Sequence, residues 1–147
     1  MKKARILVLC TQNSCRSQIA EALIRKRYGD RVEVFSAGAQ PAERVHPLAV
    51  KTLAGRGIDV SGNKPKSTDQ FTRKSFDFVI TTCDSARDSC PVFFGQHEKL
   101  HWGLEDPAKA KGTEEEVLAV FQKTADLLEE RIAGLDGEIA AINKSGD

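Results

Sequence analysis

Apolar and polar positions along the chain follow two alternating patterns. Short, nearly continuous apolar runs are typical of buried parallel strands, and they lie at residues 5–9, 32–35, 76–83 and 99–102. Apolar residues spaced three and four apart predict amphipathic helices, and they lie within residues 17–28, 47–54 and 117–135. The pattern therefore predicts strands that alternate with helices.

Local signals indicate where these helices begin and end. Gly29 follows the first helix and Pro47 opens the second, the positions that glycine and proline favour. Thr113 and Glu116 form a capping-box pattern at the start of the long helix. Ser67 is expected to cap a short helix that runs to about residue 73.

The segments between the periodic runs are polar. Residues 84–91 predict a polar, mobile loop, and residues 143–147 predict a frayed tail. A chain of 147 residues fits one domain, which we expect to span residues 1–147. Alternating strands and helices predict an open α/β sandwich with a mainly parallel sheet.

One stretch combines a strand end, a tight loop and a helix start. It reads Cys10-Thr11-Gln12-Asn13-Ser14-Cys15-Arg16-Ser17. Loop amides and a helix N-terminus favour an anion, and a guanidinium such as that of Arg16 can bind two of its oxygens. The same positive field favours the reactive thiolate of Cys10, to which the Ser17 hydroxyl can donate. The stretch predicts an oxyanion site, with residues 11–16 binding the anion and Cys10 as nucleophile.

Two further candidates fall at the ends of other strands. Cys83 ends the run at 76–83, and Asp106 lies in the loop after the run at 99–102. Ligands of open parallel sheets bind beyond the carboxyl ends of the strands. We therefore expect Cys10, Cys83 and Asp106 to share one crevice.

Composition narrows the classes of partner. The formal net charge is +1, which gives no reason to expect a nucleic-acid or membrane-surface partner. No apolar run approaches the roughly 20 residues of a membrane span, and the basic start precedes only a short apolar run, unlike a signal peptide. We expect a cytoplasmic monomer.

The four cysteines, at positions 10, 15, 83 and 90, allow several interpretations. A disulfide scaffold is disfavoured because a chain of this length can form a core without one. A zinc site would need clustered pairs of ligands and would remove Cys10 from its loop, so we expect no bound metal. Catalytic or redox-active thiols remain.

The sequence resembles the low-molecular-weight tyrosine phosphatase superfamily, and within it the thioredoxin-coupled arsenate reductases. The motifs that carry the resemblance are Cys10 to Gln18, the stretch from Val79 to Cys83, Asp88-Ser89-Cys90-Pro91, and His101-Trp102-Gly103 followed by Asp106-Pro107-Ala108. The resemblance implies a three-layer α/β sandwich with a four-stranded parallel sheet flanked by helices.

The resemblance also implies a reaction. In the reductase branch, Cys10 would attack arsenate, Cys83 would form a disulfide with Cys10, and Cys90 would take over that disulfide. Thioredoxin is the expected electron donor, although a glutaredoxin or a small thiol remains open. No cofactor is implied, and phosphate or sulfate would compete as oxyanions.

Two alternatives to the reductase interpretation remain. Asp106 before Pro107 matches the general acid of the phosphatase branch, so a protein tyrosine phosphatase is the second candidate. Ala108 and the single tyrosine, Tyr28, do not suit a phosphotyrosine pocket. The third candidate is an oxyanion-binding module without activity.

Some relatives hold a structural potassium ion near this loop. The matching positions include Asn13, Glu21 and Ser36, but a lysine, Lys66, stands near the position of an expected aspartate. The ammonium of Lys66 can neutralise Glu21 in place of potassium, so we expect no specific potassium dependence; the alternative is that Lys66 is a solvated surface lysine. None of the three histidines is assigned a catalytic role.

Overall fold

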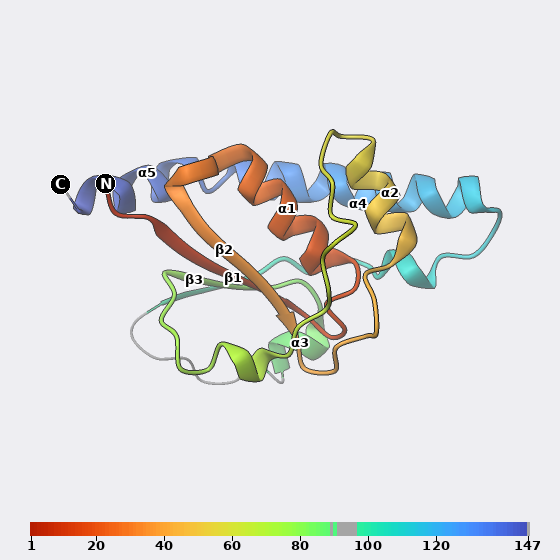
Figure 1. Ribbon diagram of the computed structural model, residues 1–147, viewed down its shortest axis with the longest axis horizontal. Coiled ribbons are helices and arrows are strands. Elements are labelled where there is room, and N and C mark those ends of the chain that lie inside the picture. Colours follow the sequence, from red (N-terminus) through yellow and green to blue (C-terminus); the bar gives the residue numbers. More distant parts are fainter. Residues whose placement is uncertain (89, 91–96, 147) are drawn as a thin grey trace.

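The computed structural model describes residues 1–88, 90 and 97–146, and within them the chain forms a four-stranded sheet with helices on both faces (Figure 1). The strands are β1 Ala4–Cys10, β2 Val32–Gly38, β3 Phe78–Thr81 and β4 Glu98–His101. The α-helices are α1 Arg16–Tyr28, α2 Pro47–Ala54, α3 Asp84–Asp88, α4 Glu114–Ala133 and α5 Asp136–Ser145. Three short 3-10 helices are η1 Gly29–Arg31, η2 Thr68–Gln70 and η3 Pro107–Lys109.

All strand pairs are parallel, in the order β2-β1-β3-β4. The first strand is therefore central, and the chain leaves it toward β2 on one side and returns to β3 on the other. This reversal of strand order is where open α/β sheets place their ligand crevice. The predicted parallel α/β sandwich is confirmed, and the loop after β1 lies at its switch point.

The central strand is buried on both faces, which explains its unbroken apolar sequence. Ile6 and Val8 face a large core beneath α1, α2, α4 and α5, whereas Leu7 and Leu9 face a smaller one. We call the smaller core the lower cluster, and it consists of Leu7, Leu9, Ala37, Phe71, Phe76, Val79 and Ala86. Figure 1 shows α1, α2 and α4 on one side of the sheet and α3 on the other.

Strand β3 is shorter than predicted, and the segment after it is not a loop. Pairing covers Phe78–Thr81, rather than 76–83, because Phe76 turns into the lower cluster and Asp77 accepts a hydrogen bond from the Arg5 amide at 2.8 Å. The predicted loop at 84–91 is wrong over Asp84–Asp88, which is helical and buries Ala86 against the lower cluster. The rest of that loop prediction, apart from residue 90, lies outside the described residues.

The C-terminal segment is also more ordered than predicted. The capping box of α4 is confirmed, but Gly134 ends that helix and a second helix, α5, follows. The tail prediction is wrong because the buried side-chain amide of Asn143 donates to the carbonyls of Lys2 (2.8 Å) and Arg31 (3.0 Å). Asp147 lies outside the described residues. No helix in the described part of the chain is long and apolar enough to cross a bilayer.

The short helix expected after Ser67 is present but ends early. Ser67 accepts a hydrogen bond from the Asp69 amide at 3.1 Å, as a helix cap does, and the 3-10 helix covers Thr68–Gln70. Phe71 then turns into the lower cluster, which directs the chain toward the sheet rather than onward to residue 73.

Candidate functional site

A cleft of about 940 Å³ opens at the carboxyl ends of the strands. Its lining includes Cys10 and Arg16 from the loop after β1, Cys83 from the end of β3, and Asp106 from the segment after β4. Residues that are distant in the sequence thus meet in one place. Cys90 does not line this cleft; it is half-buried and packs against the lower cluster.

The loop after β1 turns its carbonyls away from the cleft. Three backbone amides of the β2–α2 connection donate hydrogen bonds to those carbonyls: Gln40 to Thr11 at 2.9 Å, Ala42 to Gln12 at 2.9 Å and His46 to Ser14 at 3.0 Å. In a trans peptide the following N–H points opposite to the carbonyl. The amides after these carbonyls therefore face the interior of the loop, where an anion would sit.

A chain of hydrogen bonds fixes the donors to the Cys10 sulfur. The Lys66 backbone amide can only donate, so Asn13 accepts it through Oδ1 at 2.9 Å. Asn13 Nδ2 then donates to Ser17 Oγ at 2.7 Å, which leaves the Ser17 proton for Cys10 Sγ at 2.8 Å. The backbone amide of Asn13 donates to the same sulfur at 3.2 Å. Two donors at one sulfur are suited to a thiolate nucleophile.

Gly38 makes room for this loop. A Cβ at this position would lie 2.5 Å from the Thr11 carbonyl oxygen and 2.8 Å from the Asn13 nitrogen. The Gly38 amide also donates to the Lys66 carbonyl at 2.9 Å. The end of β2 and the anion loop can approach this closely only because position 38 has no side chain.

Arg16 connects the loop to the opposite wall of the cleft. Its Nη1 donates to the Leu104 carbonyl at 2.8 Å and its Nη2 lies 3.8 Å from Asp106 Oδ2. Its buried Nε has no hydrogen-bond partner within the described residues, so a donor remains for an oxyanion. Asp106 itself caps η3 by accepting from the Ala108 amide at 3.0 Å.

The Cys83 sulfur also receives polar contacts. It lies 3.3 Å from Thr11 Oγ1, and the Ala86 amide of the first turn of α3 donates to it at 3.4 Å. Sequence reasoning did not find the contact with Thr11, because 72 positions separate the two residues. A thiol held between the anion loop and a helix start can act on a group bound to Cys10.

The two remaining cysteines lie in less polar surroundings. Burial raises the pKa of Cys15 to about 12, so this thiol stays protonated at the start of α1. Burial also raises the pKa of Cys90, against the opposing charge of Lys99. Cys90 therefore needs a change of surroundings before it is an effective nucleophile.

At the position where the family resemblance implied potassium, two side chains of the protein itself lie beside the acidic residue. The buried Glu21 carboxylate has Arg25 Nη1 at 3.6 Å and Lys66 Nζ at 4.0 Å. The Asn13 Oδ1 oxygen already accepts two hydrogen bonds, from Gln18 Nε2 and the Lys66 amide. The charge of Glu21 and the lone pairs of Asn13 Oδ1 are thus already engaged, whereas the buried Ser36 Oγ, at the third matching position, has no hydrogen-bond partner within the described residues. Within the described residues, no group of acids, histidines and cysteines could hold a metal ion.

His46 supports the loop from outside, a role that the sequence did not predict. Its Nδ1 accepts from the Leu48 amide at 3.1 Å and so caps α2, and its ring packs on Phe121 with centroids 4.8 Å apart. Burial lowers the pKa of His46, while the charge of Asp106 partly opposes this. The neutral ring is the form that can accept the cap hydrogen bond.

We expect acid to weaken the fold at His46. Because its pKa is lower in the folded chain than the ordinary value of 6.5, the contribution to stability is present above that value and is lost as the pH falls below it. The loss is about 1 kcal/mol, the usual contribution of a helix cap. Urea unfolding at pH 7 and pH 5 measures it. His46→Asn keeps a cap but does not titrate, so this variant should lose less stability over that interval; an equal loss in both proteins would contradict the prediction.

Comparisons with known proteins agree with this arrangement. The family model described as low molecular weight phosphotyrosine protein phosphatase matches residues 5–145. An arsenate reductase of Halalkalibacterium halodurans is 46% identical over 132 residues, which cover 90% of this chain and 94% of that protein.

Solved structures show the same likeness. A thioredoxin-dependent arsenate reductase of Corynebacterium glutamicum is 33% identical with a TM-score of 0.72; the match covers 95% of this chain but only 63% of that longer chain. A structure described as an arsenate reductase in the phosphate binding state is 30% identical with a TM-score of 0.74, over 95% of this chain and 98% of that one.

Proposed function

The chain belongs to the low molecular weight phosphotyrosine protein phosphatase family, and on that premise we propose that it is an arsenate reductase, an oxidoreductase of arsenic detoxification. One observation carries this proposal: a second thiol, Cys83, lines the same cleft as the Cys10 nucleophile and Arg16. A phosphatase needs one thiol, whereas reduction of an oxyanion needs two thiols that end as a disulfide.

The first step is attack of the Cys10 thiolate on arsenate. The loop amides of residues 11–15 and the guanidinium of Arg16 hold the oxyanion, and one arsenate oxygen leaves as water when the sulfur–arsenic bond forms. Ser17 and the Asn13 amide hold the sulfur before attack, at 2.8 Å and 3.2 Å. The Asp106 carboxyl lies near Arg16 at the cleft wall, which supports its proposed role as donor of the proton to the departing oxygen.

The second and third steps move a disulfide outward. Cys83 thiolate attacks Cys10 Sγ, the sulfur–arsenic bond breaks, and its electron pair stays on arsenic, which leaves as arsenite. Cys90 thiolate then attacks Cys83 Sγ, so Cys10 departs as a thiolate and a Cys83–Cys90 disulfide remains. A dithiol donor, for which we propose thioredoxin, reduces that disulfide. The proposal places the protein in the cytoplasm, where such donors keep thiols reduced.

The phosphatase alternative rests on the same loop and on Asp106. Slow hydrolysis of a small aryl phosphate is compatible with this cleft. A phosphotyrosine pocket is not favoured, because the only tyrosine, Tyr28, lies buried in α1 and donates to the Ile132 carbonyl at 2.6 Å. The residue that lines the cleft after Asp106-Pro107 is Ala108 and not a tyrosine.

Arsenate-dependent oxidation of NADPH, coupled through thioredoxin and thioredoxin reductase, tests the proposal. We expect steady turnover with arsenate, inhibition by phosphate, and only slow hydrolysis of an aryl phosphate measured in parallel. Both activities should disappear in Cys10→Ser, and only the reductase activity should disappear in Cys83→Ser. Fast phosphatase turnover without arsenate reduction would replace the proposal with the phosphatase alternative, and anion binding without either activity would leave a binding module.

A further inference from the structure

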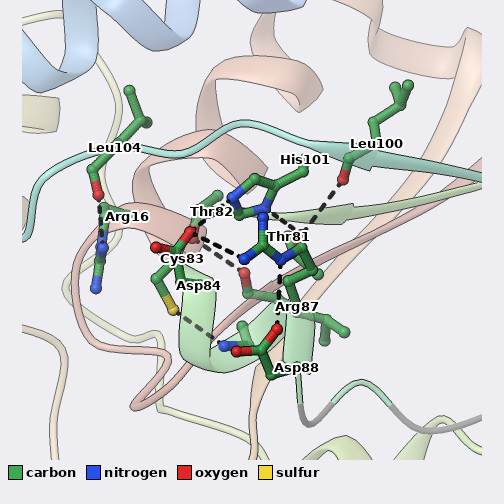
Figure 2. Close-up of polar contacts among 12 residues, drawn as sticks. Arg16, Thr81, Thr82, Cys83, Asp84, Arg87, Asp88, Leu100, His101 and Leu104 are labelled. Carbon is green, nitrogen blue, oxygen red and sulfur yellow. Dashed lines mark hydrogen bonds and ion pairs between the residues drawn. The ribbon is translucent and has the colours of Figure 1, made fainter.

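A histidine at the end of β4 connects the sheet to the first turn of α3. His101 Nε2 lies 3.1 Å from Asp84 Oδ1, and His101 Nδ1 lies 2.7 Å from Thr81 Oγ1 on the neighbouring strand. Figure 2 shows the ring between these two partners, with Cys83 directly before Asp84. Sequence reasoning gave His101 no role.

Both ring nitrogens of His101 have a hydrogen-bond partner. A carboxylate oxygen can only accept, so Nε2 donates to Asp84 Oδ1, and Nδ1 and the Thr81 hydroxyl form the second hydrogen bond. The alternative acceptor for Thr81, the Leu100 carbonyl, is farther away at 3.4 Å. The ring is thus hydrogen-bonded at both nitrogens, and β3, β4 and α3 are joined through one side chain.

This connection bears on the position of the Cys83 sulfur. The Ala86 and Arg87 amides donate to the sulfur and the carbonyl of Cys83, so Cys83 forms part of the first turn of α3. Arg87 Nη2 adds a looser contact of 3.7 Å to Asp84, from within the same helix. Among the contacts that the described residues make with the Asp84 carboxylate, only the one with His101 joins the first turn of α3 to the sheet.

Building on the proposed relay, we propose that His101 is a positioning residue that acts through Asp84. It holds the first turn of α3 so that Cys83 faces Cys10 for the first disulfide, and its contact opposes the movement by which Cys83 pairs with Cys90. Cys83 lines the cleft and Cys90 does not, so one of the two thiols must move before their Cα atoms come within the roughly 7 Å of a disulfide. Helix α3 lies between them and is joined to β4 through His101, so this contact opposes a movement of that helix.

The proposal predicts opposite effects on two successive steps. When the contact is removed, formation of Cys10–Cys83 should slow and conversion to Cys83–Cys90 should accelerate. Each change should be about two- to fivefold, the range for an exposed charged contact. The Asp84 side chain is 77% exposed, so its replacement is not expected to prevent folding.

Rapid-quench experiments on the full chain measure both steps. Reduced protein is mixed with arsenate, quenched with an alkylating agent, and mapped for each disulfide over time. The variants are Asp84→Ala and His101→Ala, with His101→Gln as the conservative variant that keeps a donor toward Asp84. Asp88→Ala is the matched control. It also removes an acid from α3, but the ion pair of Asp88 is with Arg87 in the same helix and not with a residue of β4.

Slower formation and faster conversion in the Asp84 and His101 alanine variants, with partial recovery in His101→Gln and no change in Asp88→Ala, would support the proposal. Equal slowing of both steps, or no change in either, would overturn it while leaving the relay intact. If the unaltered protein forms neither disulfide, the relay fails, and the positioning role fails with it.

Discussion

Replacing Cys90 with serine is expected to limit the protein to about one arsenate reduced per molecule. The variant keeps Cys10, Arg16 and Cys83 in the cleft, so the first two steps proceed and arsenite is released once. Without a thiol at position 90 the disulfide cannot move outward, and Cys10 remains oxidised. The variant should therefore accumulate a Cys10–Cys83 disulfide.

Two measurements check this expectation together. Arsenite released per protein should be about one in Cys90→Ser, and non-reducing peptide mapping should find the Cys10–Cys83 bond. Cys83→Ser is the matched comparison, since it retains Cys90 but lacks the thiol that attacks Cys10; it should release no arsenite. Continued turnover of Cys90→Ser with thioredoxin would show that the donor reaches the first disulfide directly, and the three-cysteine relay would be wrong.

Gly38→Ala is expected to reduce arsenate turnover by about 100-fold. The new methyl group would lie 2.5 Å from the Thr11 carbonyl oxygen and 2.8 Å from the Cys10 carbonyl oxygen. Both are backbone atoms that cannot rotate away, so the loop must shift. A displacement of about 1 Å is enough to lose two orders of magnitude in rate when it misaligns the reacting groups.

A matched substitution separates this local effect from a loss of fold. Gly62→Ala also adds one methyl group, but no atom outside this residue and its two chain neighbours lies within 4 Å of the added Cβ, and it should leave turnover unchanged. Both variants should keep the circular dichroism of the unaltered protein. Phosphate should protect Cys10 from alkylation in Gly62→Ala and fail to do so in Gly38→Ala. Full turnover of Gly38→Ala would mean that the loop tolerates the shift and does not depend on this close approach.

The sequence pattern predicted the parts of the fold that long apolar periods define. The central strand and the long helix were predictable because burial on two faces, or on one helical face, leaves a repeated signal. Helix α3 was not, because its five residues include one buried apolar side chain, Ala86. The position of Asn143 was not either, because its order comes from contacts with Lys2 and Arg31 at the other end of the sequence.

The candidate site divides in the same way. Cys10 and Arg16 lie in one continuous motif, whose chemistry can be argued from local order alone. Thr11 beside Cys83, and His101 beside Asp84, depend on the order of strands in the sheet. No spacing in the sequence encodes those pairs, so they emerge only when the three strands are placed side by side.

The hydrogen bonds between Asn143 and Lys2 have a consequence for engineering. They hold the two chain ends together, and Figure 1 shows both ends on the side of the molecule away from α3. A short covalent linker could therefore join the ends, and a new opening in an exposed turn would yield a circular permutant. Closing the backbone would also restrict the unfolded chain, so the ring form should gain stability without any new contact in the cleft.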